Sequence, residues 1–575
     1  MTYWKLWVIA LALWVLCLPA YSIDREAFSI TRYDLDVQVE PEQQRLAVRG
    51  TILLTNDSRS PKKLAVLQLS SSLTWRSIRI GDELLQFVSQ PYVSDIDHTG
   101  QLSEAIVTLP KEIAPAGTVE LNIGYEGVIV SDSTRLTRIG VPKETAIHSD
   151  WDEIGSTFSA VRGVGYVVWY PIATEVGNLS EGDSLFEVLG RWKQRERGSS
   201  MRATIHLPQT TNDSPWHVLC NGDTKSARDA PPPKQSSAEC SYAPFGWSSP
   251  AFVVGNYFGV EQKPLAVFYR PEHKTSAESF ELAAEKVKPF VTEWFGVPKS
   301  DVVVADLADP GAAPFEAGRG LLLTPFSDTD PKLLQIAMVH ELTHSAFDSP
   351  NAWIGEGLAH FAQAVYRERQ DGREVALDFM GLHRSAIAQV EQGRSGGDSR
   401  EPIADRALAT TMIEEFYRSK AAYVWWMLRD MLGDDVLRRA LEAYRPAEDT
   451  EKTYMQRLLQ KASGRDLQWF FDSWVYQDQG LPDFRVASAF SRKMSGTNYV
   501  STVTVENIGD AAAEIPVTIR FENDDVTQRL LVAGKSKAVV RLETPRVPIE
   551  VVLNDGSVPE SDLSNNTFKL GSAVQ

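Results

Sequence analysis

The sequence predicts a multidomain α+β protein with a β domain first, a mostly helical domain second and a β-sandwich last. The chain has 575 residues, and at roughly 100–200 residues per domain this length allows about three to five domains. Alternating apolar and polar residues, typical of half-buried strands, fill the first and last parts of the chain. Apolar residues at helical spacing dominate the part between them.

The β domain is predicted over residues 23–263. Its alternating runs are bounded by Asn, Asp, Gly and Pro, which favour turns between antiparallel strands. We therefore expect an all-β domain. The runs are 33–39, 46–54, 118–123, 201–207 and 252–257.

The helical domain is predicted over 264–476 and the sandwich over 482–575. Helical spacing of apolar residues first becomes clear in 279–290. Beyond residue 482 the alternation returns, and short strands separated by turns over this length are typical of a small β-sandwich. The strand runs of this last part are 499–505, 515–521 and 537–542.

The composition excludes several classes of protein and partner. With 43% hydrophobic and 23% charged residues, the chain is neither collagen-like nor wholly disordered. Lys and Arg number 58 against 76 Asp and Glu, and the net charge of -18 repels phosphate backbones, so nucleic acid is not an expected partner. Three Cys cannot form a zinc site of four thiolates. The chemistry must therefore use His, carboxylates or hydroxyls.

The N-terminal segment, 1–22, is predicted to be an export signal. An apolar run over 6–20 follows one cation and is followed by small residues at a cleavage spacing. Cys17 is not expected to be lipidated, because Leu16 stands where a small residue is needed. The protein is then periplasmic or secreted, with no membrane span in the mature chain. The alternative is an uncleaved N-terminal anchor.

Export would place the two remaining Cys in an oxidising compartment. Cys220 and Cys240 are then plausible disulfide partners, and the alternative is a pair of unbonded structural thiols.

Two histidines mark a candidate metal site. A helix is predicted over 331–347, because Asp330 followed by proline is typical of a helix start. Its sequence His-Glu-Leu-Thr-His places His340 and His344 at i and i+4, on one face. Glu341 stands beside the first histidine, where it would act as a base for water. Imidazole ligands and one open position favour zinc.

A carboxylate in the next segment would complete the ligand set. Glu356 stands in Trp-Ile-Gly-Glu-Gly, at the start of a second helix, and we expect it to be the third protein ligand of one zinc ion per chain. The alternative is an ordinary carboxylate of a helix start. His360, one turn further on, is expected to support a ligand, with direct coordination as the alternative.

These motifs resemble the gluzincin zinc metallopeptidases of the aminopeptidase N and leukotriene-hydrolase family. The family pattern is HExxH, eighteen residues and then Glu in a W-x-N-E-G-like context, whereas eleven residues separate His344 from Glu356 here. The shorter loop changes the expected rim of the site more than its ligands. The resemblance covers most of the chain. It implies a saddle-like β domain, a thermolysin-like catalytic domain and an Ig-like β-sandwich, without the family's C-terminal helical domain.

Two further segments match positions of the family. Glu316 stands in a segment that resembles the G-x-M-E-N loop, whose Glu receives the free α-amine of the substrate, although Phe315 and Ala317 replace the Met and Asn. Tyr417 stands in a segment that resembles the Y-x-K-G-A helix, whose Tyr stabilises the oxyanion. Tyr417 lies one residue further from the Lys than in the family, and Tyr423 is the alternative.

The resemblance implies an exported zinc aminopeptidase that acts on peptide substrates. His340, His344 and Glu356 would hold the zinc, and Glu341 would take the proton of the attacking water. One alternative is an endopeptidase, or another amide hydrolase, with the same metal chemistry. Another is a catalytically inactive relative that acts as a binding module through its β domains.

Overall fold

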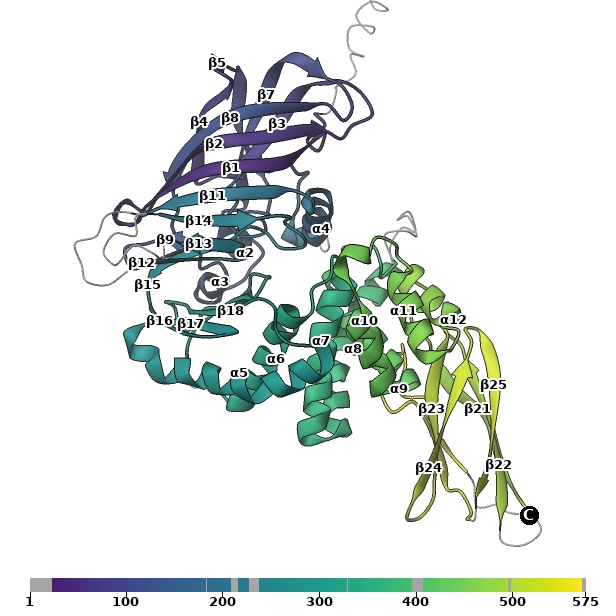
Figure 1. The fold of residues 1–575 in the computed structure, drawn as a ribbon. Coiled ribbons are helices and arrows are strands. Elements are labelled where there is room, and N and C mark those ends of the chain that lie inside the picture. The colour runs from purple at the N-terminus through teal and green to yellow at the C-terminus, as the bar shows by residue number, and fades with distance from the viewer. Residues whose placement is uncertain are drawn as a thin grey trace, which may run out of the picture.

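The computed structural model describes residues 23–570, apart from 182–183, 208–215, 227–236, 328, 396–406, 495–497 and 545. The predicted export signal, 1–22, lies outside the described residues. The described chain is a multidomain α+β protein, as predicted, with sheets, then helices, then further sheets along the chain (Figure 1). No helix in the described ranges has the length and apolar character needed to span a bilayer.

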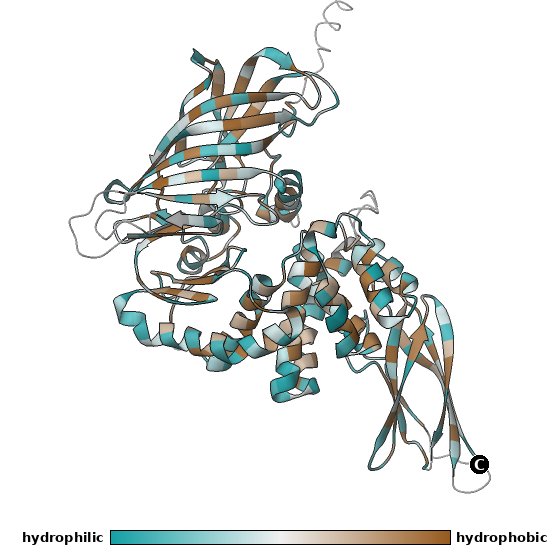
Figure 2. Ribbon diagram, viewed as in Figure 1, coloured by the Kyte–Doolittle hydropathy of each residue, from teal (hydrophilic) through white to brown (hydrophobic). Residues whose placement is uncertain are grey.

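The first domain is built around an eight-stranded sheet. Apolar and polar residues alternate along its strands (Figure 2), and in β1 the side chains of Tyr33, Leu35 and Val37 are buried while their neighbours are less so. One face of the sheet therefore covers the core of the domain. The strands in spatial order are β13 (Asp223–Ser226), β14 (Ser237–Tyr242), β11 (Ser200–His206), β1 (Phe28–Glu40), β2 (Arg45–Asn56), β8 (Thr118–Val128), β4 (Leu73–Ile80) and β5 (Glu83–Leu84).

Two smaller sheets complete the strands of this domain, and a disulfide ties one of them to the large sheet. Cys220 on the smaller sheet is bonded to Cys240 on β14, with the Cα atoms 6.3 Å apart. Of the two alternatives that the sequence allowed, the structure has the bonded pair. One small sheet has the order β3 (Lys62–Ser70), β7 (Gln101–Ile113), β6 (Phe87–Val93), and the other β12 (Trp216–Cys220), β15 (Phe252–Asn256), β10 (Phe158–Val161), β9 (Glu153–Ile154).

The first domain also contains helices, so the prediction of an all-β domain is wrong. In the longest helix, α4, Leu185, Val188 and Trp192 are buried at helical spacing. This apolar stripe packs into the core of the domain. The same periodicity is present in the sequence, but its thirteen residues lie between strand runs that dominate the pattern. The helices are α2 (Thr134–Arg138), α3 (Lys143–Ser149) and α4 (Ser184–Glu196).

The second domain begins with a five-stranded mixed sheet. Its central strands are parallel, and β19 is an antiparallel edge strand. The crossover from β17 to β18 is made by the long helix α5 (Lys274–Phe295). The strands in spatial order are β16 (Phe258–Gln262), β17 (Leu265–Tyr269), β18 (Val302–Asp306), β20 (Leu321–Thr324) and β19 (Phe315–Glu316).

Helices make up the rest of the second domain. The helix predicted over 331–347 is α6, and the Asp330 side chain accepts a hydrogen bond of 2.8 Å from the backbone of Lys332, so it caps the helix. The α6 helix packs between α5 and α7. The helices are α6 (Pro331–Ala346), α7 (Ala352–Asp371), α8 (Arg373–Ser395), the π-helical turn η5 (Phe416–Lys420), α9 (Ala421–Leu432), α10 (Asp434–Ala443), α11 (Tyr454–Ser463), α12 (Gln468–Phe471) and the π-helical turn η7 (Asp472–Tyr476).

The last part of the described chain is a sandwich of two antiparallel sheets. Val503 and Val505 of one sheet and Val517 and Ile519 of the other are buried in the same apolar core. Strands were predicted at each of these positions. One sheet has the order β21 (Phe484–Lys493), β22 (Tyr499–Asn507), β25 (Ser536–Thr544), and the other β24 (Asp525–Val532), β23 (Ala513–Arg520), β26 (Glu550–Leu553), β27 (Thr567–Lys569).

Candidate metal centre and its cleft

Helix α6 carries the two histidines of the candidate metal site. Because four residues make just over one helical turn, His340 and His344 project from the same side of the helix. Their Nε2 atoms lie 3.2 Å apart. His340 is buried, and His344 is partly exposed. The helix therefore places two imidazole nitrogens close enough together to bind the same metal ion.

Two carboxylates from separate elements complete the cluster. Glu356, near the start of α7, has an oxygen 3.6 Å from His344 Nε2. Glu316, on the edge strand β19, has oxygens 3.1 Å from His340 Nε2 and 3.5 Å from His344 Nε2. One ligand atom from each of the four residues lies within 4.8 Å of the others. The fold thus gathers residues from one strand and two helices.

The spacing of these atoms fits a single metal ion. A tetrahedral zinc ion bound at about 2.0–2.1 Å holds its ligand atoms about 3.3 Å apart. The separation between the two histidines is 3.2 Å, and those between histidine and carboxylate atoms are 3.1, 3.5 and 3.6 Å. The cluster could therefore bind a metal ion. It offers four protein ligands, one more than catalytic zinc sites use.

Glu341 is a buried carboxyl beside the cluster. Burial raises its pKa to about 8, and the negative charges of Glu316 and Glu356 act in the same direction. Its Oε2 atom has no hydrogen-bond partner among the described residues. A carboxyl group in this state can take up or release a proton close to neutral pH.

The pKa values of the two histidines are shifted in opposite directions. Burial lowers the pKa of His340, but the carboxylate of Glu316 outweighs burial and raises the pKa to about 9. Burial lowers the pKa of His344 below its ordinary value. Without a metal ion, the Glu316 carboxylate is therefore neutralised mainly by protonated His340.

His360 lies beside a ligand rather than in the ligand cluster. Its ring centroid is 4.8 Å from that of His340, and its Nδ1 atom lies 3.1 Å from the side-chain oxygen of Gln363. The group of atoms that could hold a metal ion does not include it. This position agrees with a supporting role and not with direct coordination.

The structure places the two candidate tyrosines differently. Tyr417 is buried on η5 and lines the cavity that also contains Glu316 and Glu356. Burial raises its pKa well above the ordinary value, so its hydroxyl stays protonated and can donate a hydrogen bond. The Tyr423 hydroxyl already donates to the carbonyl oxygen of Met380, at 2.9 Å in the helical core. Of the two, only Tyr417 lines this cavity.

Tyr417 and Lys420 lie on one π-helical turn, η5. The wider turn of η5 takes up one residue more than an α-helix would. Lys420 still reaches Asp478, with a separation of 2.6 Å in the core. The turn therefore lets Tyr417 face the cleft while Lys420 keeps its buried ion pair.

Arg418 is a charged residue of the site that the sequence analysis missed. Its guanidinium lies 3.1 Å from Glu356 and 2.8 Å from Glu414. It is also 4.0 Å from Glu316. Arg418 thus offsets part of the negative charge of the cluster. The sequence carries no signal for this contact, because the π-helical turn decides which way the side chain points.

Two cavities meet at the cluster. One of about 440 Å³ includes Tyr417 and Arg418, and one of about 680 Å³ includes His344. Both are lined by Glu316 and Glu356, and Trp247 of the first domain also lines both. The cluster therefore lies at the base of a cleft between the first and second domains.

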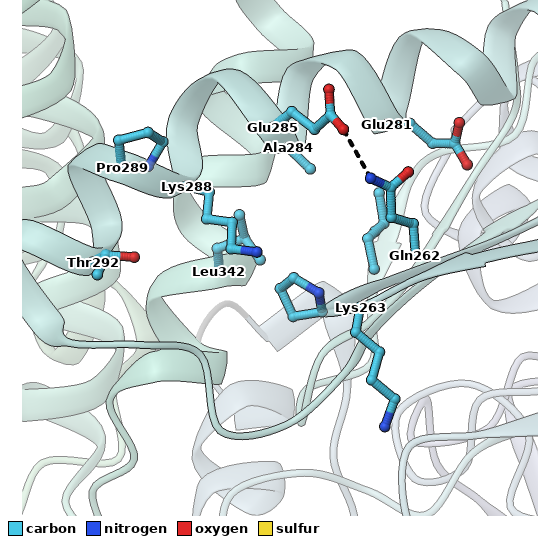
Figure 3. A pocket seen from close by; sticks show the side chains of 11 residues that line it. Gln262, Lys263, Glu281, Ala284, Glu285, Lys288, Pro289, Thr292 and Leu342 are labelled. Atoms are coloured by element: carbon cyan, nitrogen blue, oxygen red, sulfur yellow. Dashed lines mark hydrogen bonds between the residues drawn. The ribbon is translucent and has the colours of Figure 1, made fainter.

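Another cavity lies on the other side of α6 (Figure 3). It has a volume of about 410 Å³ and is lined by Leu342 and by residues of α5, with a hydrogen bond of 2.8 Å from Gln262 to Glu285 across it. Leu342 stands two residues from each histidine and so points to the opposite face of the helix. This cavity is separate from the metal site.

Comparison with known proteins shows a likeness in fold. No protein-family model matches the sequence, and no curated protein matches it. Solved structures do match, and one is aminopeptidase A of Legionella pneumophila in complex with aspartic acid, with a TM-score of 0.56 and 14% identity. The chain is similar in fold to this aminopeptidase. The match covers 94% of the chain and 60% of the aminopeptidase, so the chain spans less than two thirds of that protein's length.

Proposed function

We propose that the protein is a zinc-dependent aminopeptidase, which hydrolyses the first peptide bond of its substrates. The observation that carries this proposal is the convergence of His340, His344 and Glu356 beside the buried carboxyl of Glu341. The likeness in fold to an aminopeptidase supports it. Zinc is the proposed ion, because imidazole and carboxylate ligands at these separations suit its size and geometry.

Each residue of the site then has a task. His340, His344 and Glu356 would hold a zinc ion, which when bound polarises a carbonyl and acidifies water. Glu341 would accept the proton of the attacking water and pass it to the leaving amine. Tyr417 would donate a hydrogen bond to the developing oxyanion, a contribution of about 3–4 kcal/mol for such donors.

Glu316 is proposed to bind the substrate's free α-amine, which restricts the enzyme to chain ends. It lies on edge strand β19, beside which an extended peptide can add as a further strand. Its oxygens also lie at ligand distance from both histidines. The specific alternative is that Glu316 is a fourth metal ligand, which would close the open position that a catalytic zinc ion needs.

The finer architecture and the location of the protein are also proposals. We propose a saddle-like first domain, a thermolysin-like catalytic domain and an Ig-like sandwich, in line with the motif resemblance. We propose that the chain is exported to the periplasm or secreted. The disulfide between Cys220 and Cys240 supports export, because such bonds persist in oxidising compartments.

The first experiment measures zinc content and hydrolysis together. Purified protein should contain one zinc ion per chain and cleave aminoacyl-arylamides, with activity lost on chelation and restored by zinc. Glu341→Gln should keep its zinc and lose about 10²–10⁴-fold in kcat, because the base for water is removed. A suitable control is Glu285→Gln in the separate cavity, which should leave both zinc content and activity unchanged. Zinc far below one equivalent, or a fully active Glu341→Gln, would refute the proposal.

The second experiment separates the two roles of Glu316. If Glu316 binds the amine, Glu316→Gln keeps its zinc and loses activity on substrates with a free amine, and wild-type protein does not cleave N-acetylated peptides. If Glu316 is a ligand, Glu316→Gln binds zinc much more weakly. Equal cleavage of free and N-acetylated peptides by the wild type would identify an endopeptidase instead.

A further inference from the structure

The wall of the cleft contains a lysine that forms no hydrogen bond or ion pair with any residue that the structure describes. Lys193 lies on α4, a helix of the first domain, and lines the cavity of about 440 Å³ that contains Glu356, Tyr417 and Arg418. Its side chain is partly buried. Within the described part of the chain, it makes no hydrogen bond and no ion pair. Since an ammonium group removed from water needs a compensating charge, this position favours an anionic ligand.

The other cations of this wall already have partners. Arg135 forms a double contact with Asp150, at 2.6 and 2.9 Å. Arg162 binds Asp152 at 2.6 Å. The guanidinium of Arg418 is held by Glu356 and Glu414, as described above. Among the described cations of this wall, Lys193 is therefore the one whose charge is available to bind a substrate.

Close packing between the two domains fixes the position of Lys193. Gly190, one turn before it on α4, approaches the second domain so closely that an added Cβ would lie 2.6 Å from the Cβ of Met412. Residues three apart lie on the same side of a helix, so Lys193 faces the segment that leads into η5. Burial lowers its pKa, and the charges of Glu414, Arg418 and Glu356 all act on it.

The two cavities differ in volume and in lining, and this difference indicates which part of a peptide substrate each would hold. The cavity with Lys193 is the smaller of the two, about 440 Å³ against about 680 Å³, and its lining includes the buried residues Arg135 and Val164 as well as the exposed Phe186. The other cavity runs to the exposed residues Asp348, Pro350 and Pro446. The smaller cavity suits one side chain, and the larger one, which reaches exposed residues, suits the rest of a peptide. The side chain of the N-terminal residue therefore belongs beside Lys193.

We propose that Lys193 is a specificity-determining residue, which binds the side-chain carboxylate of an N-terminal Glu or Asp. This inference rests on the proposed aminopeptidase function. The carboxylate would replace the missing partner of the ammonium group, while Glu316 holds the α-amine. Glu414 does not cancel the charge of Lys193, because its carboxylate is engaged by Arg418 at 2.8 Å.

The test compares glutamyl and glutaminyl substrates, which have similar shapes and differ in charge. Wild-type protein should have a higher kcat/KM for glutamyl-arylamide than for glutaminyl- or alanyl-arylamide. Lys193→Met should lose about 10- to 100-fold on the glutamyl substrate, as expected for a lost charge-assisted hydrogen bond, and keep its activity on the other two. Lys193→Arg should keep the preference. Lys288→Met, at an exposed position on α5, is the control and should change nothing.

A binding measurement makes the inference independent of turnover. Zinc-loaded Glu341→Gln protein is titrated with the dipeptides Glu-Ala and Gln-Ala in a calorimeter, with and without Lys193→Met. Tighter binding of Glu-Ala that disappears in the double variant supports the role of Lys193, even if no substrate is cleaved and the proposed function fails. If the protein hydrolyses alanyl-arylamide but binds Glu-Ala and Gln-Ala equally, the proposed role of Lys193 is wrong. The aminopeptidase proposal then still stands.

Discussion

The close contact between α7 and α9 makes a sharp prediction about Gly357. This glycine follows the candidate ligand Glu356, and an added Cβ would lie 2.6 Å from the Cβ of Ala421 and 3.0 Å from the ring of Trp425. Contacts this short force the two helices apart. Gly357→Ala should therefore destabilise the domain and move Glu356 away from the histidines.

The magnitude follows from two opposing effects. Inserting a methyl group into a packed core costs about 1–3 kcal/mol, whereas replacing a glycine inside a helix by alanine gains about 0.5–1 kcal/mol. Gly355, on the same helix, has nothing within 4 Å of an added Cβ, so Gly355→Ala shows the gain alone. The difference between the two variants is the cost of the contact, about 1–3 kcal/mol.

Thermal unfolding of the two variants and the wild type, without added zinc, measures this difference. For a domain of about 200 residues, 1 kcal/mol corresponds to roughly 2–4 °C in Tm, so Gly357→Ala should unfold roughly 2–12 °C below Gly355→Ala. Zinc titrations should show weaker binding by Gly357→Ala. Equal Tm values for the two alanine variants would refute the packing argument, and unchanged zinc affinity would refute the link to Glu356.

Three further predictions concern the metal, the disulfide and the helix cap. Zinc binding at pH 7 should release about one proton from His340, because the pKa of this imidazole is about 9 and a zinc ligand must be deprotonated. The zinc affinity should therefore rise with pH until the imidazole is neutral. Calorimetry in buffers of different ionisation enthalpy measures the number of protons released. Replacing Cys220 and Cys240 by Ser should lower the free energy of unfolding by about 3 kcal/mol for a closed loop of this length, and reduction of the wild type should lower Tm by as many degrees as the double substitution does. Asp330→Ala should cost about 1 kcal/mol in unfolding experiments, because Lys332 loses the acceptor for its backbone N–H, while Asp330→Asn should cost less.

The sequence was sufficient to predict those strands and helices whose periodicity depends only on neighbouring residues. The alternation in 33–39 and 499–505 corresponds to β1 and β22, and the helix predicted over 331–347 is α6. A period of two or of 3.6 residues is a local property, because each side chain's direction follows from the backbone of its own element. For the same reason, the spacing of His340 and His344 was enough to place both on one face of a helix.

The missed parts depend on contacts between segments far apart in the chain. Helix α4 was overlooked although its apolar spacing is regular, and nothing in its sequence indicates that Gly190 meets Met412 of the next domain. The same is true of Arg418, whose direction is set by the π-helical turn. Pairing and packing between distant segments are decided by the whole fold.

The sequence by itself determined the residue types of the candidate site and the local elements that carry them. It placed two histidines and a base on one helix and carboxylates in two other segments, because ligand chemistry and helical spacing are encoded locally. Only the tertiary structure decided that Glu316 lies at ligand distance from His340, that Tyr417 rather than Tyr423 lines the cleft, and that Lys193 of the first domain stands in its wall. These are relations between elements separated by many residues, and packing of the complete chain alone determines them.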